Sequence, residues 1–458
     1  MISFRGFDDV IKRVYDNNQE HVFASWDRLG PGQRESLLKD LADVDFGLMK
    51  KLFTAAGAPS HGSYRPAPFI PLPKTPAEHE KFRKAAALGE ELIRGGKIAA
   101  FIVAGGQGSR LGYEGPKGKF PVGPVSGKTL FRLHGEKILA SGRRYGVAIP
   151  WFVMTSHANH RETVEYFESE KYFGLDPRDV FVFPQNMIPS LDEKGRLILE
   201  SECGVFKNPD GHGGSLSALR TSGALDEMKS RGITVISYFQ VDNPLVKIID
   251  PVFIGFHRDA GADISSKALR KAYAEEKVGV FVQYADNTLG IVEYSDMPQE
   301  KINERDPGGE LLYSSGNPAI HLFGREFIER ITSSDLSLPY HTAKKKIAAH
   351  GGGEITGYKF EKFVFDALSM TDRNVILEVL REEEFAPVKN ASGADSLETC
   401  IKLMDGLHRQ WLGARGAKIS PKTRIVEISP LYALGADDIP AGLALPERES
   451  VLLEAEVR

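Results

Sequence analysis

An apolar run that breaks into a glycine-rich, cationic loop is the feature of this sequence that most constrains its fold. The run is KIAAFIVA, residues 97–104, and the loop after it reads GGQGSRLGYEGPKGKFP. Four glycines precede Gly115 in this loop, namely Gly105, Gly106, Gly108 and Gly112. Glycine lacks a Cβ, so these positions permit positive φ and a close approach of the main chain to a ligand. Together with Arg110 and Lys117, the loop is expected to wrap backbone N–H groups and positive charge around a polyphosphate.

The spacing of the loop excludes two common phosphate-binding motifs. A dinucleotide fingerprint G-x-G-x-x-G would need glycine at position 111, which is Leu111. A Walker A loop ending at Gly127-Lys128-Thr129 would need glycine at position 122, which is Val122. What remains is a strand followed by G-G-x-G-[ST]-R-L-G-x-x-x-P-K-G.

The segments around the loop predict an α/β fold with a mostly parallel sheet. Helical periodicity covers residues 8–57, and a helix is expected over 78–96, ending at Gly95-Gly96. From there on, β-rich runs at 97–104, 147–155, 180–183 and 234–241 alternate with amphipathic stretches. A hairpin is expected around Asp286-Asn287 and a helix near 397–412. We therefore predict a helical N-terminal region (1–95), a catalytic domain (96–395) and a small C-terminal β domain (396–458).

Composition excludes several classes of protein. The chain has 458 residues, 41% of them hydrophobic, and a net charge of −4, which disfavours general nucleic-acid binding. Cys203 and Cys400 are its two cysteines, too few for a disulfide framework or a cysteine zinc site. No apolar run approaches the ~20 residues of a membrane helix, and residues 1–18 lack a secretory apolar core. We expect a cytoplasmic protein without membrane or nucleic-acid partners, while its oligomeric state stays open.

A carboxylate follows the predicted strand 234–241. Asp242 would lie at the carboxyl end of this strand, beside the predicted ligand crevice, where a carboxylate and substrate phosphates hold Mg²⁺. The alternative is a turn or helix cap, because Asp-Asn-Pro starts turns well. His157 and His160 are three residues apart, but no acidic or cysteine partner near them completes a metal site, so we interpret them as surface or core residues.

For the further candidates, the residues alone favour a structural interpretation over a functional one. The run NPDGHGG, 208–214, precedes a predicted helix and could bind a ligand or simply form a turn. Gln185 ends a strand with an amide, which can recognise a base edge. Lys389 follows three glutamates and could belong to a solvated charged face. Phe363 and Phe365 are core aromatics unless a sugar lies against them.

Several separated segments match one family in order. Besides the glycine loop, they include QEHVFASWDRLGPGQRESLLKDLADVDF near the N-terminus and VEISPLYA near the end. The chain resembles the eukaryotic-type UDP-N-acetylhexosamine pyrophosphorylases, within the wider group of UDP-sugar pyrophosphorylases. That resemblance implies a GT-A-like, Rossmann-type mixed sheet with a helical N-terminal region and a small β C-terminal domain.

The resemblance also implies a role for each candidate residue. It implies nucleotide binding by Gly105, Gly106, Gly108, Gln185, Gly211 and Gly213. It implies catalytic, phosphate-binding roles for Arg110, Lys117 and Lys389. It implies sugar binding by His212, Glu293, Asn317, Phe363 and Phe365. Asp242 would bind Mg²⁺, the implied cofactor.

Departures from the family pattern concern the sugar. Ser109 stands where threonine is common, and the hydroxyl is kept. His212 replaces the asparagine usual in the acetylhexosamine enzymes, and P-x-G-H-G is instead like the UDP-glucose pyrophosphorylases. Ile320 stands where asparagine is expected. The predicted partners are therefore UTP and a sugar 1-phosphate, with N-acetylglucosamine 1-phosphate first and glucose, galactose or a broad range as the alternative.

The sequence disfavours two other classes of function. A dinucleotide-dependent oxidoreductase is disfavoured because Leu111 breaks the fingerprint. A non-catalytic nucleotide-sugar sensor would keep the pocket without turnover, but Arg110, Lys117, Asp242 and Lys389 are all retained. In the expected reaction the sugar phosphate attacks the α-phosphorus of UTP in line, and pyrophosphate leaves. The nucleophile is already ionised, so the chemistry needs positioning and charge neutralisation and no general base.

Overall fold

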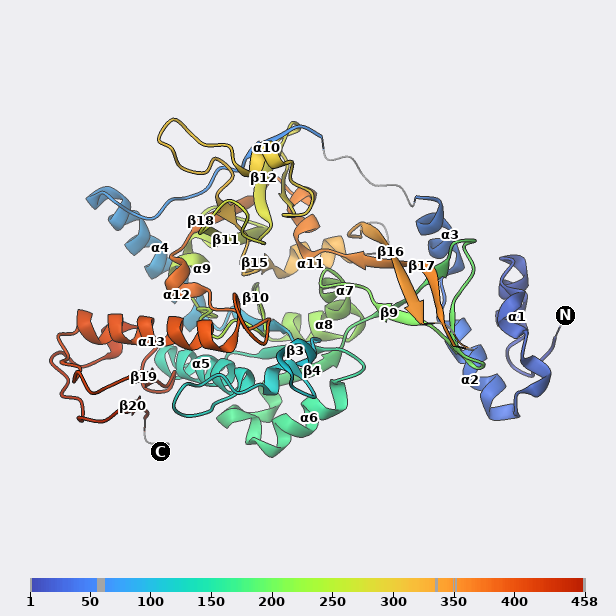
Figure 1. The fold of residues 1–458 in the computed structure, drawn as a ribbon, viewed down its shortest axis with the longest axis horizontal. Helices are drawn as coiled ribbons and strands as arrows, with labels where there is room; N and C mark the ends of the chain where they lie inside the picture. The colour runs from blue at the N-terminus through green and yellow to red at the C-terminus, as the bar shows by residue number, and fades with distance from the viewer. Residues whose placement is uncertain (1, 56–61, 334–336, 349, 351, 456–458) are drawn as a thin grey trace. The chain divides into compact units, whose positions relative to one another are not determined.

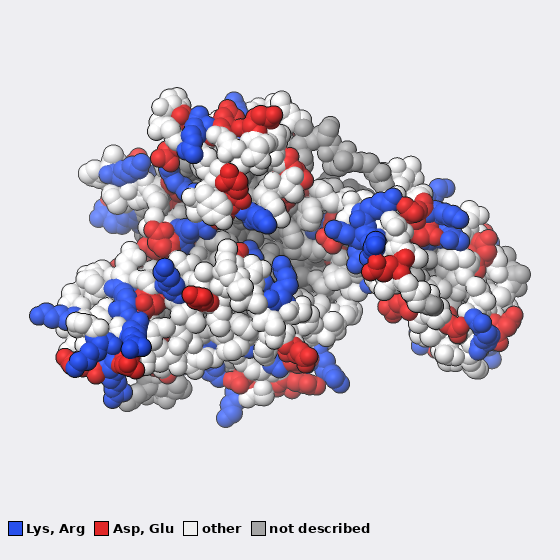
Figure 2. Space-filling model, in the orientation of Figure 1, with Lys and Arg blue, Asp and Glu red and all other residues white. Residues whose placement is uncertain are grey.

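A computed structural model describes residues 2–55, 62–333, 337–348, 350 and 352–455 (Figure 1). They form two compact units that share the chain. Unit 1 comprises Met1–His61, Gln185–Ser217 and Ser337–Asp366, and unit 2 comprises Gly62–Pro184, Ala218–Leu336 and Ala367–Arg458. Among the described residues, no helix combines the length and the apolar character needed to cross a membrane. Lys and Arg residues lie among Asp and Glu residues over the face of each unit that Figure 2 shows.

Unit 2 is built on one large mixed sheet. Its strand order is β1-β12-β14-β11-β15-β10-β2-β3-β4, with β13 paired to β12 and β18 to β11. The strands are β1 (Tyr64–Pro66), β2 (Ile98–Val103), β3 (Trp151–Thr155), β4 (Val180–Pro184), β10 (Val235–Gln240), β11 (Ile264–Arg270), β12 (Val280–Tyr284), β13 (Leu289–Val292), β14 (Ser315–Gly316), β15 (His321–Gly324) and β18 (Asn374–Glu378). β10, β2, β3 and β4 run parallel, and β15 is antiparallel to both β10 and β11.

The parallel half of this sheet confirms the α/β prediction. The four predicted apolar runs are β2, β3, β4 and β10, and β3 is buried along its whole length. Such continuous apolar strands are typical of parallel strands covered on both faces. The predicted hairpin is β12–β13, with Asn287 at φ 69° in its turn. The antiparallel strand β15 makes the sheet mixed rather than wholly parallel.

Helices pack on this sheet in unit 2. They are α4 (Pro76–Arg94), α5 (Leu130–Tyr145), α6 (His160–Ser169), α8 (Ala224–Ser230), α9 (Pro251–Asp259), α10 (Gln299–Ile302), α11 (Arg325–Ile331), α12 (Arg381–Glu384) and α13 (Leu397–Ala414). α4 begins at a Thr75 capping box and ends before Gly95-Gly96, as predicted. α4 and α9 touch at two glycines, because a Cβ on Gly89 would lie 1.9 Å from the Pro251 oxygen and one on Gly255 1.7 Å from the Ala85 oxygen.

The C-terminal segment of unit 2, residues 415–455, packs against α5 and α13. These two helices lie side by side in Figure 1 and share one apolar core. β19 (Ile425–Ile428) and β20 (Ser450–Leu453) form a parallel pair there. The buried carboxylate of Glu427 on β19 accepts hydrogen bonds from the backbone N–H groups of Val125 and Ser126, both at 2.7 Å. This strand pair therefore holds the loop that leads into α5.

Unit 1 combines three helices with small antiparallel sheets. The helices are α1 (Asp8–Asp16), α2 (Pro31–Ala42) and α3 (Phe46–Thr54), and residues 56–57 of the predicted helical stretch lie outside the described residues. The strands are β5 (Met187–Pro189) with β9 (Lys207–Pro209), β7 (Leu199–Ser201) with β8 (Gly204–Val205), and β16 (Tyr340–Ala348) with β17 (Glu354–Lys362) and β6 (Leu191–Asp192). Apolar helix faces and strand residues such as Phe360 share one core. Helix α7 (Gly214–Thr221) follows the glycine turn.

Candidate functional site

The glycine loop leaves the carboxyl end of β2 and is held by a buried asparagine. Asn159 Nδ2 donates to the carbonyl oxygens of Ala104 (3.0 Å) and Gly106 (3.3 Å), and its Oδ1 accepts from Ser156 N. The side chain is fully buried. The carbonyl oxygen of Gly106 also accepts a hydrogen bond from Lys117 N at 3.0 Å. This bond joins the start of the loop to its end.

The glycines of the loop serve different purposes. Gly112 (φ 69°) and Gly115 (φ 114°) have positive φ, whereas Gly105, Gly106 and Gly108 do not use the positive φ that glycine permits. Gly108 is required by close packing, because its Cβ would lie 2.8 Å from the Tyr113 ring. A Cβ on Gly106 would meet open space, which leaves the main chain there accessible to a ligand.

Two predicted site residues meet at the carboxyl ends of β2 and β10. Lys117, in the 3-10 turn Lys117–Lys119, is 7% exposed, and its Nζ lies 3.2 Å from Asp242 Oδ2. The two strands are adjacent and parallel, so residues that follow them emerge at the same edge of the sheet. Arg110 lies in the 3-10 turn Ser109–Leu111 of the same loop and is exposed. The structure therefore brings a lysine, a carboxylate and the glycine loop together.

A neutral histidine lies behind this pair. His134, on α5, is fully buried, and its Nε2 lies 3.0 Å from the Val241 oxygen. Burial lowers its pKa to about 3, with the positive charge of Lys137 acting in the same direction. The imidazole therefore supports the backbone before Asp242 without adding charge.

Lys389 is carried to the same edge by the backbone. Val388 N donates to the backbone carbonyl oxygen of Asp242 at 2.9 Å. This bond anchors the segment that bears Lys389. Lys389 Nζ lies 3.7 Å from Asp395 and 5.5 Å from the centroid of the Phe385 ring. Burial raises the pKa of Glu293, Asp296 adds to this effect and Lys389 opposes it. Lys389 thus lies close enough to Glu293 for their charges to interact.

Asn317 lies beside Glu293. Asn317 N donates to the Gly279 oxygen at 2.9 Å, and its Oδ1 accepts from Ala319 N at the same distance. A Cβ on Gly279 would lie 3.1 Å from Glu293 Oε1. The predicted sugar-binding pair therefore lies within unit 2, at the residue after β13 and in the β14–β15 connection.

Unit 1 assembles a second group, around the Gly211–Gly213 turn. Gly211 has φ 85°, and its Cβ would lie 2.4 Å from the Lys362 oxygen, which accepts from Gly213 N at 2.8 Å. Both glycines are therefore needed for the close approach of the turn to the end of β17. Asp210 is buried beneath the start of α7, where burial raises its pKa to about 6 against the opposing charge of Lys362.

His212 projects from this turn into an aromatic stack. Its Nδ1 accepts from Val364 N at 3.2 Å, and its ring stacks on Phe363 with centroids 5.4 Å apart. The centroid of the Phe365 ring lies 5.6 Å from that of the His212 imidazole. His341 stacks on Phe363, with ring centroids 4.4 Å apart. Burial lowers the pKa of His212 to about 4, so it is neutral at physiological pH. Gln185 is buried at the first residue of the middle segment of unit 1.

Sequence reasoning missed Asn159 and Asp210. Asn159 lies within SHANH, between His157 and His160, and the two loop carbonyls that its Nδ2 contacts lie more than fifty positions earlier in the chain. His160 Nδ1 instead bonds Thr155 Oγ1 at 2.8 Å. Across the described ranges, no group of three or more His, Cys, Asp or Glu residues is arranged to hold a metal ion.

The chain carries a glycine loop and a lysine–carboxylate pair at one edge of an α/β sheet, and the comparisons identify it as a nucleotidyltransferase. The chain belongs to the UTP--glucose-1-phosphate uridylyltransferase family, whose model matches residues 71–435. It is 36% identical over 462 residues to "UDP-N-acetylglucosamine diphosphorylase 2" of Arabidopsis thaliana, covering 94% of this chain and 91% of that protein. It is 35% identical to the human "UDP-N-acetylhexosamine pyrophosphorylase-like protein 1", covering 97% and 96%.

Solved structures agree with this assignment. The uridine diphosphate N-acetylglucosamine pyrophosphorylase of Trypanosoma brucei, crystallised with an inhibitor, has a TM-score of 0.85 and 27% identity, with both chains fully covered. A UDP-glucose phosphorylase of the same organism has a TM-score of 0.62 and 16% identity over 92% of this chain and 91% of that one, and it shares the fold.

Proposed function

We propose that this protein transfers the uridylyl group of UTP to N-acetylglucosamine 1-phosphate, forming UDP-N-acetylglucosamine and pyrophosphate. The observation that carries the proposal is the Lys117–Asp242 pair, 3.2 Å apart, beside the glycine loop. The relatives are named for the N-acetylated sugar, which supports this choice of substrate. Cytoplasmic localisation, expected from the sequence, is part of the same proposal.

Charge repulsion is the main obstacle to this reaction. Each phosphate monoester carries about −1.5 to −2 charge at neutral pH, and two such anions must meet. The sugar phosphate oxygen attacks the α-phosphorus in line, and the bond to the pyrophosphate oxygen breaks. Lys117 and Arg110 would stabilise the leaving pyrophosphate, and Lys389 would help hold the phosphates. Because Lys117 is almost fully buried, its charge would act in a region of low dielectric.

Magnesium fits the donor set around Asp242. A carboxylate is a ligand that Mg²⁺ prefers, and a site with one protein carboxylate leaves room for substrate phosphates and water. We propose that Asp242 holds the ion, with Lys117 beside it. When bound, the ion would neutralise phosphate charge.

The remaining residues complete the proposed recognition of the substrates. The main chain at Gly105, Gly106 and Gly108 would meet the nucleotide, together with Gln185, Gly211 and Gly213. Glu293 would accept hydrogen bonds from sugar hydroxyls, and the amide of Asn317 could both accept from them and donate to them. The stack of His212, Phe363 and Phe365 would offer an apolar surface to the N-acetyl side of the sugar.

The choice of sugar is tested by a panel of substrates. Pyrophosphate release would be measured with UTP and the 1-phosphates of N-acetylglucosamine, N-acetylgalactosamine, glucose and galactose. We expect the highest kcat/KM with N-acetylglucosamine 1-phosphate. A preference for glucose 1-phosphate would favour the alternative suggested by His212, while UDP-sugar binding without turnover on any substrate would indicate a sensor and reject the proposal.

A further inference from the structure

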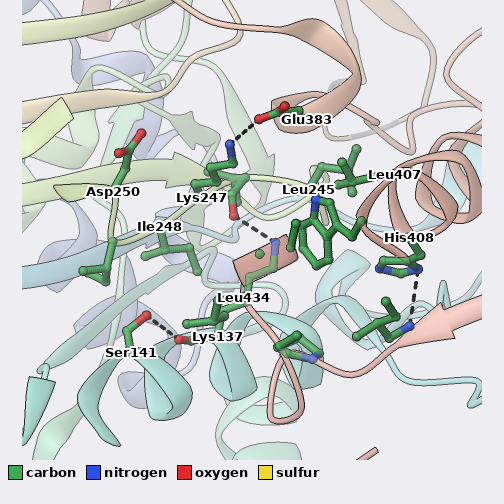
Figure 3. Close-up of a pocket in the computed structure, with 18 of the residues that line it drawn as sticks. Lys137, Ser141, Leu245, Lys247, Ile248, Asp250, Glu383, Leu407, His408 and Leu434 are labelled. Atoms are coloured by element: carbon green, nitrogen blue, oxygen red, sulfur yellow. Dashed lines mark hydrogen bonds and ion pairs between the residues drawn. The ribbon is translucent and has the colours of Figure 1, made fainter. Parts of the chain in front are cut away.

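A cavity of about 420 Å³ lies on the α5–α13 side of unit 2, and none of the residues assigned to the reaction line it (Figure 3). Its walls come from α5, from the loop 244–251 after β10, from α12, from α13, and from the end of β19 with the segment after it. They are largely apolar and include Leu133, Leu245, Met404, Leu407, Trp411 and Ile428. Cavities of roughly 300–1,000 Å³ with apolar walls and a few polar groups are typical of small-molecule sites.

Lys137 supplies a positive charge to this cavity. It projects from α5, and its Nζ donates to the carbonyl oxygens of Pro244 and Val246, the latter at 2.9 Å. Among the residues that the structure describes, no carboxylate forms an ion pair with it. An ammonium group has three donors, so one is left after these two carbonyl bonds. Burial lowers the pKa of Lys137 to about 7, with Glu384 opposing and Lys247 and Lys267 adding to the effect.

The acids around the cavity are engaged elsewhere. Glu383 pairs with Lys247 at 2.5 Å, as Figure 3 shows, and Asp250 pairs with Lys267 at 2.7 Å. Glu384 Oε1 lies 2.6 Å from Lys267 Nζ, and its Oε2 accepts from the backbone N–H of Lys247. Each acid therefore has a cationic partner, while Lys137 has carbonyl partners alone. A buried cation without a counter-charge is strongly stabilised by an incoming anion.

We propose that this cavity binds a small amphipathic anion, an aromatic or aliphatic molecule with one acidic group placed on Lys137. The apolar body would pack against Leu407 and the indole of Trp411, whose ring adds a stacking surface. The occupant would accept the third N–H of Lys137, beside the carbonyls of Pro244 and Val246. The site is separate from the proposed reaction and is tested without its substrates.

The test compares two fluorescent probes that share an aromatic body. 8-Anilinonaphthalene-1-sulfonate carries one sulfonate, and N-phenyl-1-naphthylamine is its uncharged counterpart. Each would be titrated into the full chain at about pH 6, below the pKa of Lys137. Lys137→Met keeps the length of the side chain and removes its charge. Lys402→Met, an exposed position on α13 outside the cavity, is the matched control.

We expect Lys137→Met to weaken the sulfonate probe roughly tenfold or more and to leave the uncharged probe within about twofold. Lys402→Met should change neither. Ala414→Trp, at the exposed rim of the cavity, should block both probes and gives a second arm if Lys137→Met fails to fold. Equal sulfonate affinity in wild type and Lys137→Met, or probe binding that survives Ala414→Trp, would overturn the proposal.

Discussion

At the scale of single residues, the proposed chemistry depends on charges held in buried or half-buried positions. Lys117 and Asp242 face each other at 3.2 Å, and the buried amide of Asn159 holds the loop that carries the lysine. The lysine and the carboxylate come from different segments, the glycine loop and the residue after β10, and the fold holds them side by side. The pair is therefore preorganised before any substrate arrives, which is the condition for electrostatic catalysis.

Removing the charge of Lys117 should abolish most turnover. We expect Lys117→Ala to lower kcat by roughly two orders of magnitude or more, the scale of losing one preorganised electrostatic group. The measurement is pyrophosphate release, with circular dichroism to show an intact fold. Lys119→Ala is the matched control in the same turn, because Lys119 is paired with Glu162 at 2.6 Å and should lose at most about fivefold. Near-normal turnover in Lys117→Ala would remove this residue from the catalytic role.

The metal assignment makes a separate prediction. Asp242→Asn should raise the Mg²⁺ concentration for half-maximal rate by about tenfold or more, because a neutral amide is a poorer ligand than a carboxylate. The check is a Mg²⁺ titration of the rate at saturating substrates. Asp286→Asn, in the exposed β12–β13 turn, keeps its side-chain oxygen for Thr288 and should leave the titration unchanged. A titration curve that does not move in Asp242→Asn would contradict the assignment.

The third residue-level prediction concerns sugar choice. His212→Asn keeps an oxygen that can accept from Val364 N but removes the ring stacked on Phe363. We expect the ratio of kcat/KM for N-acetylglucosamine 1-phosphate over glucose 1-phosphate to rise by roughly tenfold. The wild-type ratio should not change between about pH 6 and 8, because His212 has a pKa of about 4 and stays neutral. Identical ratios in the variant and the wild type would mean that His212 does not read the sugar.

At the scale of elements, glycines let helices and turns approach one another more closely than any other residue would. α4 and α9 touch at Gly89 and Gly255, and the Gly211–Gly213 turn lies against the end of β17. A backbone carbonyl occupies the space of each missing Cβ at the helix pair, and a carbonyl cannot rotate away as a side chain can. The contact therefore depends on the absence of a side chain.

A pair of helical glycines tests this reading. Gly255→Ala in α9 should lower the free energy of unfolding by about 1–3 kcal/mol, because the added Cβ would lie 1.7 Å from the Ala85 oxygen. Gly406→Ala in α13 has no neighbour within 4 Å of its Cβ and should stabilise by about 0.5–1 kcal/mol through helix propensity. Thermal or urea unfolding gives both values. If both substitutions changed the free energy of unfolding equally and in the same direction, close contact would not be what distinguishes Gly255 from Gly406.

At the scale of the whole molecule, both compact units are discontinuous in sequence. The chain leaves unit 2 after Pro184 and returns at Ala218, then leaves again after Leu336 and returns at Ala367. Each unit has its own apolar core. The three-segment division expected from the sequence stays a prediction.

Buried neutral histidines should make the whole molecule acid-sensitive. Burial lowers the pKa of His134 to about 3 and that of His257 and His408 to about 4. In the unfolded chain a histidine takes up a proton near pH 6.5, so stability is present above that value and is lost as pH falls toward 4. Asp210 acts in the opposite sense below its pKa of about 6. We expect the melting temperature to fall from about pH 7 to pH 5.

A single substitution measures one of these contributions. His257→Gln should reduce the loss of unfolding free energy between pH 7 and pH 5 by about 2 kcal/mol, because the glutamine side chain does not titrate. His79→Gln, at an exposed position on α4, should leave the pH dependence as in the wild type. A melting temperature that stays constant from pH 7 to pH 5 would contradict the expected neutrality of the buried histidines.

Local patterns were sufficient for the elements and for the class of reaction. The apolar runs became β2, β3, β4 and β10 because strands buried on both faces need apolar residues at every position. The glycines and cations of the phosphate loop follow one another in the chain, so the loop can be found by spacing alone. The order of motifs along the chain indicated the family, which the comparisons confirm.

Long-range contacts decided the rest. The Asn159 amide reaches a loop more than fifty residues earlier, Val388 binds the backbone of Asp242, and the cavity at Lys137 takes its walls from five separate segments. The antiparallel strand β15 and the division of the chain into two interleaved units likewise have no local signature. A one-dimensional pattern records which residues can bury, turn or carry charge. Which of them meet depends on packing between segments that are distant in the chain, and only the tertiary structure settles it.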